Sequence, residues 1–238
     1  MIYILLPSYN EEKNLLRIFR KIENIKYPKI TVVVVDDCSK DNTYRLIKKK
    51  YKFKLRYVRH KKNKGLSLTL ETGFKEINKT ATKNDLVVTM DSDNTHPVEK
   101  ITKMQKKIIQ GYDLAIASRF VKNSKVNGLS SLRKFMSNGA KYLFKLFYPY
   151  KNLNDYTCNY RMYKYSLIKK IIKNKSFFKN EDFNIAAKII LFLLEKTDDL
   201  KLVEIPFVLN YQYKIGQSKM RLFRTIFLTI RLILFKKI

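Results

Sequence analysis

Two carboxylates one residue apart follow an apolar run near the middle of the chain. Residues 86–90 are apolar apart from one threonine, and Asp91-Ser92-Asp93 comes directly after them. Carboxylate oxygens are the hard ligands that Mg²⁺ or Mn²⁺ prefers when a diphosphate supplies the others. The same residues, with Pro97 close behind, are also typical of a polar turn before a helix. Taken alone, the tripeptide leaves both interpretations open.

The surrounding pattern predicts the elements that position these carboxylates. Residues 86–90 suit a strand covered on both faces, residues 2–6 and 31–35 suit buried strands, and residues 55–58 and 113–117 suit two further strands. We interpret residues 2–6 as a first strand rather than a signal peptide. Helices are expected between the strands, with Asp41 or Asn42 capping the second. Their apolar residues recur at spacings of three and four: Leu15, Ile18, Phe19 and Ile22; Leu66, Leu70, Phe74 and Ile77; Ile101, Met104 and Ile108.

This alternation predicts βαβ units, and therefore an α/β fold with a mostly parallel sheet flanked by helices. The carboxyl ends of parallel strands share one edge, where ligands bind in such sheets. Gathering carboxylates there is costly unless a cation or hydrogen-bond donors offset their repulsion, which favours a metal-diphosphate site over a simple turn. The polar residues after four predicted strands are Tyr9 and Glu11, Asp36 and Asp37, Asp91 and Asp93, and Ser118 and Arg119.

Composition narrows the class of protein. The 238 residues suit one large domain, and 50 Lys+Arg against 20 Asp+Glu give a net charge of +30. Such a charge favours an anionic lipid surface or nucleic acid as a partner. Cys38 and Cys158 do not form a disulfide framework or a zinc motif, so a reduced cytoplasmic setting is expected.

Two basic segments carry aromatic and aliphatic residues at helical spacing. They cover residues 132–147 and 222–235, and neither offers the roughly 20 uninterrupted apolar residues that span a bilayer. Each suits either a helix that packs on the core or one that lies on anionic lipid. We expect a domain over residues 1–215 and a basic amphipathic tail over residues 216–238 that lies on a membrane surface.

Short motifs follow one another along most of the chain. They are residues 7–11 (PSYNE), 35–43 (VDDCSKDNT), 63–65 (NKG), 91–97 (DSDNTHP), 118–120 (SRF), Arg133 with Ser137, 155–161 (DYTCNYR), 204–207 (EIPF) and 216–219 (GQSK). In this order they resemble the motifs of the inverting glycosyltransferases of family 2, which have the GT-A (Rossmann-like) fold. Within that family they are most similar to polyprenyl-phosphate and dolichol-phosphate sugar synthases, and the resemblance covers residues 2 to about 220.

The resemblance implies roles for particular residues. Arg119, Arg133 and Ser137 would bind the phosphate of a lipid acceptor, for which arginine offers a fixed fork of donors. Lys219 and the metal would offset charge on the departing nucleoside diphosphate. Asp93 would hold Mg²⁺ or Mn²⁺ with Asp91 close to it. The residues implied to line the nucleoside and ribose pocket are Pro7, Tyr9, Glu11, Asp37 and Asp91.

The implied reaction transfers a sugar, with inversion, from a GDP- or UDP-sugar to a polyprenyl phosphate. The enzyme would be peripheral, at the cytoplasmic face of a membrane. His96 is more typical of a structural histidine at a helix start than of a base. Three residues depart from the family pattern: Thr95 stands where glutamine is usual, Tyr213 where arginine is frequent, and Asn159 where glycine is usual, which Asn tolerates if the site needs positive φ.

Two other functions are open on the sequence. A family 2 enzyme acting on a saccharide or another hydroxyl acceptor would need a general base, for which Glu181 or Asp182 is available. A processive polysaccharide synthase is disfavoured because the chain has no tryptophan. A basic nucleic-acid-binding protein is the more remote alternative, since no recognised binding motif accompanies the charge, and we expect no specific nucleic-acid partner.

Overall fold

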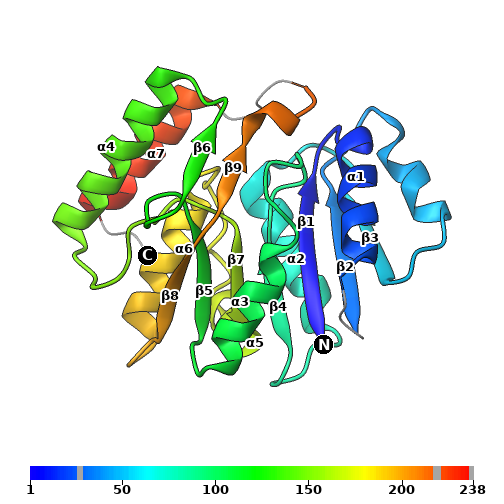
Figure 1. The fold of residues 1–238 in the computed structure, drawn as a ribbon, viewed down its shortest axis with the longest axis horizontal. Coiled ribbons are helices and arrows are strands. Elements are labelled where there is room, and N and C mark those ends of the chain that lie inside the picture. The colour runs from blue at the N-terminus through cyan, green and yellow to red at the C-terminus, as the bar shows by residue number, and fades with distance from the viewer. Residues whose placement is uncertain (26–28, 217–220, 236–238) are drawn as a thin grey trace.

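A twisted sheet forms the centre of the computed structural model, which describes residues 1–25, 29–216 and 221–235 (Figure 1). The seven strands lie in the order β3-β2-β1-β4-β7-β5-β8. Outside this sheet, β6 (Lys125–Asn127) and β9 (Val208–Asn210) pair in parallel. The strands of the large sheet are β1 (Ile2–Ser8), β2 (Ile30–Asp36), β3 (Lys54–Arg59), β4 (Leu86–Thr89), β5 (Leu114–Ser118), β7 (Arg161–Lys164) and β8 (Leu202–Pro206).

The predicted mostly parallel sheet is confirmed. Leu5 at the centre of β1 is in register with Val33 of β2 on one side and with Thr89 of β4 on the other, both in parallel. β7 runs antiparallel to both of its neighbours, β4 and β5. The carboxyl ends of β1, β2, β4 and β5 consequently reach the same edge of the sheet.

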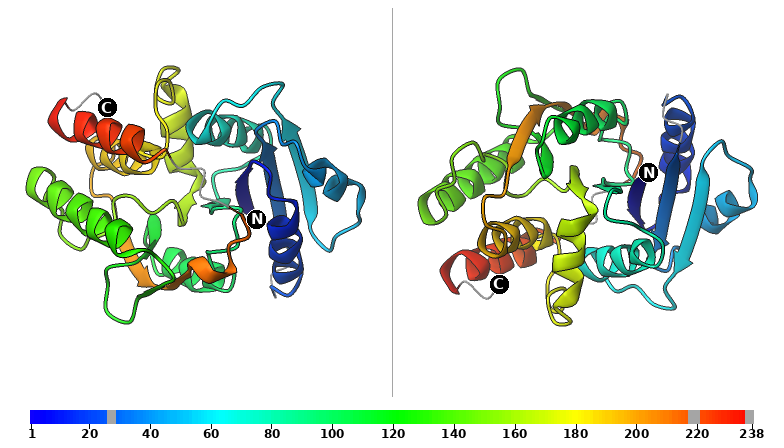
Figure 2. Two further views of the ribbon diagram at one scale, coloured as in Figure 1. Left: turned by 90° about the horizontal axis from the view of Figure 1, so that it is seen from above. Right: turned by 90° about the horizontal axis from the view of Figure 1, so that it is seen from below.

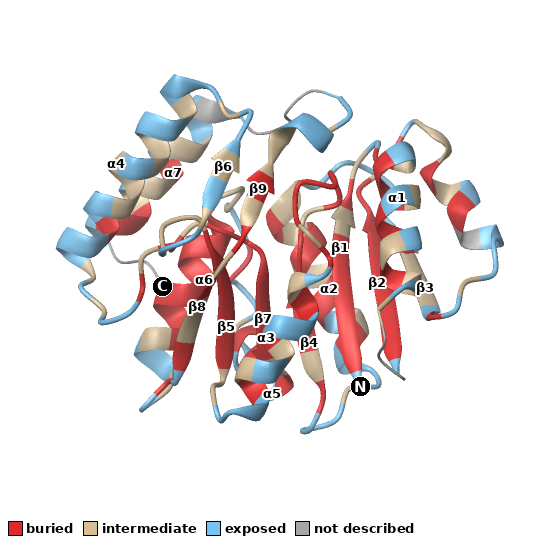
Figure 3. Cartoon of the chain, in the orientation of Figure 1, coloured by how far each residue is buried: buried red, intermediate tan, exposed pale blue. Residues whose placement is uncertain are grey.

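Helices cover both faces of the sheet (Figure 2). α1 and α3 pack on the face that carries Ile2, Ile4 and Leu6, whereas α2, α5 and α6 pack on the opposite face. The apolar residues predicted to form one face of each helix are buried, except that Leu66 is half-buried. The inner strands β1, β2, β4, β5 and β7 are buried along most of their length, whereas the edge strand β3 is only partly buried (Figure 3). The helices are α1 (Glu12–Glu23), α2 (Leu66–Asn78), α3 (Lys100–Ile109), α4 (Ser131–Phe147), α5 (Tyr165–Lys173), α6 (Ile185–Lys196) and α7 (Leu222–Phe235).

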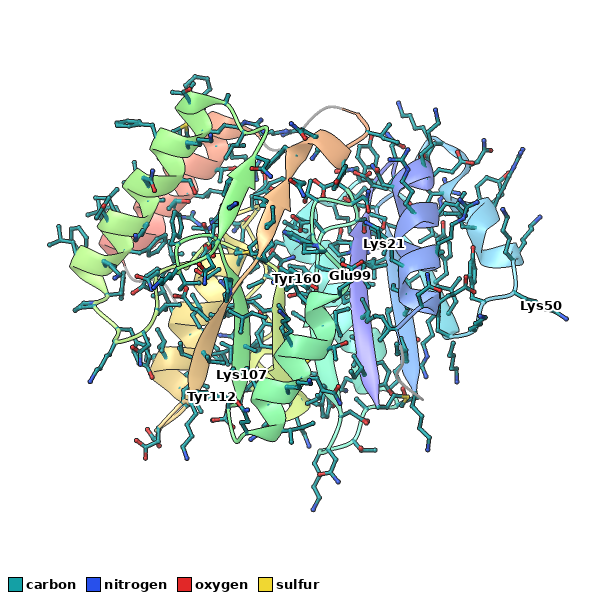
Figure 4. The ribbon with its side chains drawn as sticks, viewed as in Figure 1. Lys21, Lys50, Glu99, Lys107, Tyr112 and Tyr160 are labelled. Atoms are coloured by element: carbon teal, nitrogen blue, oxygen red, sulfur yellow. The ribbon has the colours of Figure 1, made fainter. Side chains whose placement is uncertain are left out.

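One expected helix takes a tighter form. Residues Asn42–Lys48 form a 3₁₀ helix, η1, and Asp41 caps it by accepting a hydrogen bond from the Thr43 backbone N–H at 3.0 Å. Thr43 and Leu46, three residues apart, are buried. That spacing suits the three residues per turn of a 3₁₀ helix. Lys50, just beyond this helix, points outward (Figure 4).

α4 and α7 lie beside each other at the end of the molecule next to β6 and β9 (Figure 1). α7 buries Leu228, Leu232 and Ile233 against the protein, and the Tyr148 hydroxyl donates to the Ile233 carbonyl oxygen at 3.1 Å. The two helices also expose large apolar side chains, among them Phe135 and Phe227. Within the described part of the chain, every helix is too short or too polar to cross a bilayer.

Candidate active site

A pocket of about 1000 Å³ opens where the polar strand ends meet α4 and α7. The residues after β1, β2, β4 and β5 reach it, as the alternation of strands and helices predicts. Lys219 lies outside the described residues. The other residues assigned to the site in the sequence all line this pocket: Pro7, Tyr9, Glu11, Asp37, Asp91, Asp93, Arg119, Arg133 and Ser137. Their individual roles stay predictions.

Asp93 is buried and accepts hydrogen bonds through both carboxylate oxygens. Its Oδ1 accepts from the Thr95 hydroxyl at 2.7 Å, and its Oδ2 is 2.7 Å from the Lys214 ammonium. Burial by itself raises the pKa of Asp93, but Lys214 and then His96 outweigh it, so the pKa is lowered. Asp93 is therefore an anion that already attracts a cation.

Asp91 differs from Asp93 in its exposure. Its side chain is 42% exposed toward the pocket, although surrounding protein atoms still limit its hydration. This limited hydration raises the pKa of Asp91, opposed by His96 and reinforced by the charge of Asp93. Asp91 therefore presents its carboxylate to a ligand more openly than Asp93 does.

His96 supports the turn that carries both carboxylates. Its Nδ1 accepts a hydrogen bond from the Asp91 backbone N–H at 3.0 Å, and its Nε2 lies 3.8 Å from the Asp91 carboxylate. The ring stacks on Tyr160 with centroids 4.9 Å apart, and the Tyr160 hydroxyl donates to the Pro97 carbonyl oxygen at 2.7 Å. Tyr160 lies inside the molecule (Figure 4). These contacts agree with the structural interpretation of His96.

Asp37 holds the loop that opens α2. Its Oδ1 accepts from the Lys64 backbone N–H at 2.8 Å, and its Oδ2 accepts from the Gly65 backbone N–H at 2.8 Å. His60 Nδ1 lies 2.8 Å from the same Oδ1. Gly65 has a φ of 84°, a conformation that glycine adopts without a Cβ clash. The motif at residues 63–65 is thus joined to the end of β2 by a single carboxylate.

Arg119 and Asp155 form a buried bidentate pair. Arg119 Nε donates to Asp155 Oδ2 at 2.8 Å, and Nη2 donates to Oδ1 at 2.6 Å. Nη2 also donates to the Thr157 hydroxyl at 2.6 Å. Burial raises the pKa of Asp155, but the adjacent guanidinium lowers it by more, so the pKa is lowered overall. This pairing fixes the position of Arg119 at the pocket wall.

α4 and α7 supply the remaining wall, which is mixed in character. Arg133 and Ser137 of α4 face the pocket, as do Arg221 before α7 and Arg224 within it. Arg221 and Arg224 are not among the site residues predicted from the sequence; their place in a basic amphipathic segment was the available signal. Apolar lining residues from this region are Leu129, Met136, Leu143, Ile226 and Ile230.

The two acids considered as general bases are in ion pairs. Glu181 Oε1 is 2.9 Å from the Lys188 ammonium and 3.4 Å from Arg231 Nη2, and only 6% of its side chain is exposed. Asp182 Oδ2 is 3.7 Å from Arg224 Nε. Burial raises the pKa of Asp182, and Arg224 opposes the shift. Asp182 is the better placed of the two to act as a base, because Glu181 is held by two cations.

The three departures from the family pattern have different outcomes. Thr95 binds Asp93 directly, as described above, and Tyr213 lies on the surface while Lys214 faces the pocket. Asn159 does not have a positive φ, so the position does not need the left-handed conformation that glycine favours. Its backbone carbonyl accepts from the Thr89 hydroxyl at 2.6 Å.

The comparison with protein families decides the class of this chain. The model described as "Glycosyl transferase family 2" matches residues 3–172, which include the strand ends and both carboxylates of the site. The chain belongs to glycosyl transferase family 2. The predicted resemblance is thereby confirmed.

Two named relatives of this family 2 chain have related descriptions. A dolichol-phosphate mannosyltransferase from Pyrococcus furiosus is 33% identical over 221 residues, covering 92% of this chain and 58% of the relative. A polyprenol monophosphomannose synthase from Mycolicibacterium smegmatis is 29% identical over 174 residues, covering 71% of this chain and 63% of the relative. The chain therefore spans about three fifths of the length of each.

The fold is also found among solved structures. Glucosyl-3-phosphoglycerate synthase from Mycobacterium tuberculosis, crystallised with Mn²⁺, UDP and glucosyl-3-phosphoglycerate, superposes with a TM-score of 0.68. The match covers 97% of this chain and 78% of that chain at 14% identity. At that identity the likeness shows the GT-A fold of this family 2 chain and nothing about its substrates.

The oxygen atoms at the strand ends fit a divalent cation whose remaining ligands come from a substrate. Asp91 and Asp93 offer carboxylate oxygens, and the Lys214 ammonium on Asp93 shows that the position favours positive charge. Among the residues the structure describes, no group of three or more His, Cys, Asp or Glu side chains could enclose a metal. Two carboxylates plus diphosphate oxygens are the arrangement expected for Mg²⁺ or Mn²⁺ in an open site.

Proposed function

We propose that this protein transfers a sugar from a nucleotide-diphosphate sugar to a polyprenyl phosphate, with inversion at the anomeric carbon. The observation that carries the proposal is the composition of the pocket. Carboxylates at the strand ends, arginines from three segments and an apolar wall from α4 and α7 line one continuous space. A charged donor, a phosphate and an apolar chain can therefore meet there. The descriptions of the two curated relatives support the same acceptor class.

The donor is assigned to the strand ends. Pro7, Tyr9, Glu11 and Asp37 would line the nucleoside and ribose site of a GDP- or UDP-sugar, with Asp91 beside the diphosphate. Asp91 and Asp93 would hold Mg²⁺ or Mn²⁺. When bound, such an ion offsets the negative charge that develops on the leaving nucleoside diphosphate. Lys219 is assigned to the same anion.

The acceptor phosphate is assigned to the side of the pocket nearer α4. Arg119 has its Nε and Nη2 groups on Asp155 and Thr157, so Nη1 is the group that we assign to the phosphate. Arg133 and Ser137, four residues apart on α4, face the same space and would complete the phosphate site. The prenyl chain would leave the pocket along the apolar residues of α4 and α7.

An in vitro transfer assay tests the proposal. The protein is incubated with labelled GDP- and UDP-sugars, Mg²⁺ or Mn²⁺ and polyprenyl phosphate, and labelled sugar is measured in the organic phase. We expect label in that phase with one donor and not when the polyprenyl phosphate is omitted. No product with any donor, from protein shown to be folded by circular dichroism, would contradict the proposal.

The role of Asp182 separates a phosphate acceptor from a hydroxyl acceptor. A phosphate oxygen is already anionic near neutral pH, so we expect Asp182→Asn to change the rate of lipid-linked transfer by no more than about twofold. A hydroxyl acceptor needs a base, and the same substitution would then lower the rate by roughly 10²–10⁴-fold. Initial rates measured with polyprenyl phosphate and with a saccharide acceptor distinguish these outcomes. Thermal unfolding of the variant checks that its fold is intact.

We also propose that α4 and α7 place the protein on a membrane surface as a peripheral enzyme at the cytoplasmic face. Their outward surfaces combine exposed apolar rings with lysines, and Lys134, Lys141 and Lys145 of α4 lie among them. Apolar side chains that enter the headgroup region beside cations favour anionic lipid. The net charge of +30 acts in the same direction and needs no nucleic-acid partner to account for it.

Replacing Phe135 and Phe227 by serine should weaken binding to vesicles that contain anionic lipid at least roughly tenfold, because each ring contributes apolar area to insertion. The two residues are 76% and 66% exposed, so the free energy of unfolding should change little. Sedimentation with vesicles measures the binding. Ile109→Ser, on α3, is the matched control: Ile109 is 74% exposed but lies on another surface. An equal loss in the control variant would refute the assignment of this surface.

A further inference from the structure

Lys214 occupies the cation position at Asp93. We propose that its ammonium is a built-in counter-ion of Asp93, and that a divalent metal must displace it to bind there. The inference rests on the proposed function, because it concerns the metal and diphosphate of that site. The inference gives Lys214 a role. Its neighbour Tyr213 stands where arginine is frequent in the family pattern.

The ion pair is close and shielded from water. Lys214 Nζ lies 2.7 Å from Asp93 Oδ2, with 15% of the lysine side chain and 13% of the aspartate side chain exposed. A carboxylate at this distance favours the charged form of the lysine, so Lys214 faces Asp93 as an ammonium. A buried charge pair of this geometry attracts more strongly than a surface pair, because solvent screens it less.

The backbone beside Lys214 is anchored to the donor side of the pocket. The Asn14 amide donates to the Ile215 carbonyl oxygen at 3.2 Å and to Glu11 Oε2 at 2.6 Å. The first turn of α1 thus holds the segment after η2 (Tyr211–Tyr213) against the strand ends. Lys214 reaches Asp93 from a fixed backbone, while its long side chain can still turn to another anion.

Lys214 and a metal ion would use the same oxygen atom. Oδ1 of Asp93 is held by Thr95, and Oδ2 faces the ammonium, so a metal ligated through Oδ2 excludes the ion pair. A donor diphosphate brings new anionic oxygens to which the displaced ammonium can move. Metal should therefore bind weakly without nucleotide and much more tightly together with it.

Removing the lysine charge tests this competition directly. Mn²⁺ is titrated into the free protein, without nucleotide, and bound metal is followed by the loss of the free-ion electron paramagnetic resonance signal. We expect Lys214→Met to bind Mn²⁺ roughly tenfold or more tightly than the unchanged protein, because the metal no longer has to displace an ammonium from Oδ2; a tenfold change corresponds to about 1.4 kcal/mol. Lys214→Arg keeps the charge and should bind Mn²⁺ as weakly as the unchanged protein.

Lys21→Met is the matched control. Lys21 Nζ binds Asn94 Oδ1 at 2.9 Å, one residue from Asp93, and the side chain extends from α1 toward this turn (Figure 4). The Lys21→Met substitution removes one positive charge close to Asp93 but leaves the ion pair between Lys214 and Asp93 in place. Equal Mn²⁺ affinity in Lys214→Met and Lys21→Met, or no gain in Lys214→Met, would overturn the inference. The proposed function is judged separately by lipid-linked transfer in the unchanged protein, so the two can fail independently.

Discussion

Asp93→Asn is expected to lower the rate of sugar transfer by roughly 10²–10³-fold, the loss usual when one preorganised electrostatic group is removed from an active site. Asp93 is buried at the end of β4 and is held by Thr95 and Lys214. An amide keeps the size of the side chain but removes the charge that a divalent cation requires. Initial rates with saturating donor and with added Mg²⁺ or Mn²⁺ measure the effect.

The control for Asp93→Asn is a carboxylate at the other edge of the sheet. Asp113 lies just before β5, and its carboxylate is 2.7 Å from the Lys164 ammonium. It is therefore at the amino end of β5, whereas the pocket lies at the carboxyl end. Asp113→Asn should leave the rate within about twofold, because partly exposed ion pairs contribute little. A similar loss in both variants would show that overall charge or stability, and not the site, controls the rate.

The second large effect concerns stability. Replacing Arg119 by Met leaves the Asp155 carboxylate, whose side chain is 0% exposed, without its guanidinium partner. Breaking a buried pair in this way costs about 3–5 kcal/mol of the free energy of unfolding. Equilibrium urea unfolding near neutral pH measures it. Lys164→Met, which breaks the partly exposed pair with Asp113, should cost no more than about 1 kcal/mol.

The stability lost in Arg119→Met should depend on pH in a definite direction. In the unchanged protein the pKa of Asp155 is lowered on folding, so its contribution to stability is present above about pH 4 and is lost as the pH falls through the folded-state pKa. Without the Arg119 guanidinium, burial is opposed mainly by the backbone N–H donors, so we expect the folded-state pKa of Asp155 to be raised. The variant should therefore recover part of its deficit as the pH falls toward about 4, where the carboxyl is neutral.

A double variant separates the lost pair from the stranded charge. Adding Asp155→Asn to Arg119→Met removes the unpaired anion, so the double variant should be more stable near neutral pH than Arg119→Met alone. Asp155 also accepts hydrogen bonds from the Arg119 backbone N–H through Oδ2 and from the Cys158 backbone N–H through Oδ1, each at 3.0 Å, and the single amide oxygen of asparagine can keep only one of these two bonds. A double variant less stable than both single variants would show that the carboxylate stabilises the fold mainly through those backbone groups.

Local sequence determined the elements on the amino-terminal side of the chain and the identity of the strand-end residues. Short β-branched runs such as Val32–Val35 in β2 alternate with helical periodicity, and both patterns arise from neighbours in sequence. The parallel arrangement followed, because helices between strands bring each strand back in the same direction. The convergence of Glu11, Asp37, Asp91 and Arg119 on one pocket could be predicted from that topology alone.

The tertiary structure decided which partners these residues have. Arg119 with Asp155 joins residues 36 positions apart, and Lys214 with Asp93 joins residues 121 positions apart. β7 enters the sheet antiparallel between β4 and β5, which no local pattern signals. Pairing over such separations depends on how the whole chain packs, so the spacing of residues in the sequence does not predict these pairs. The sequence therefore identified the acids of the site, and only the fold showed that Lys214 already neutralises one of them.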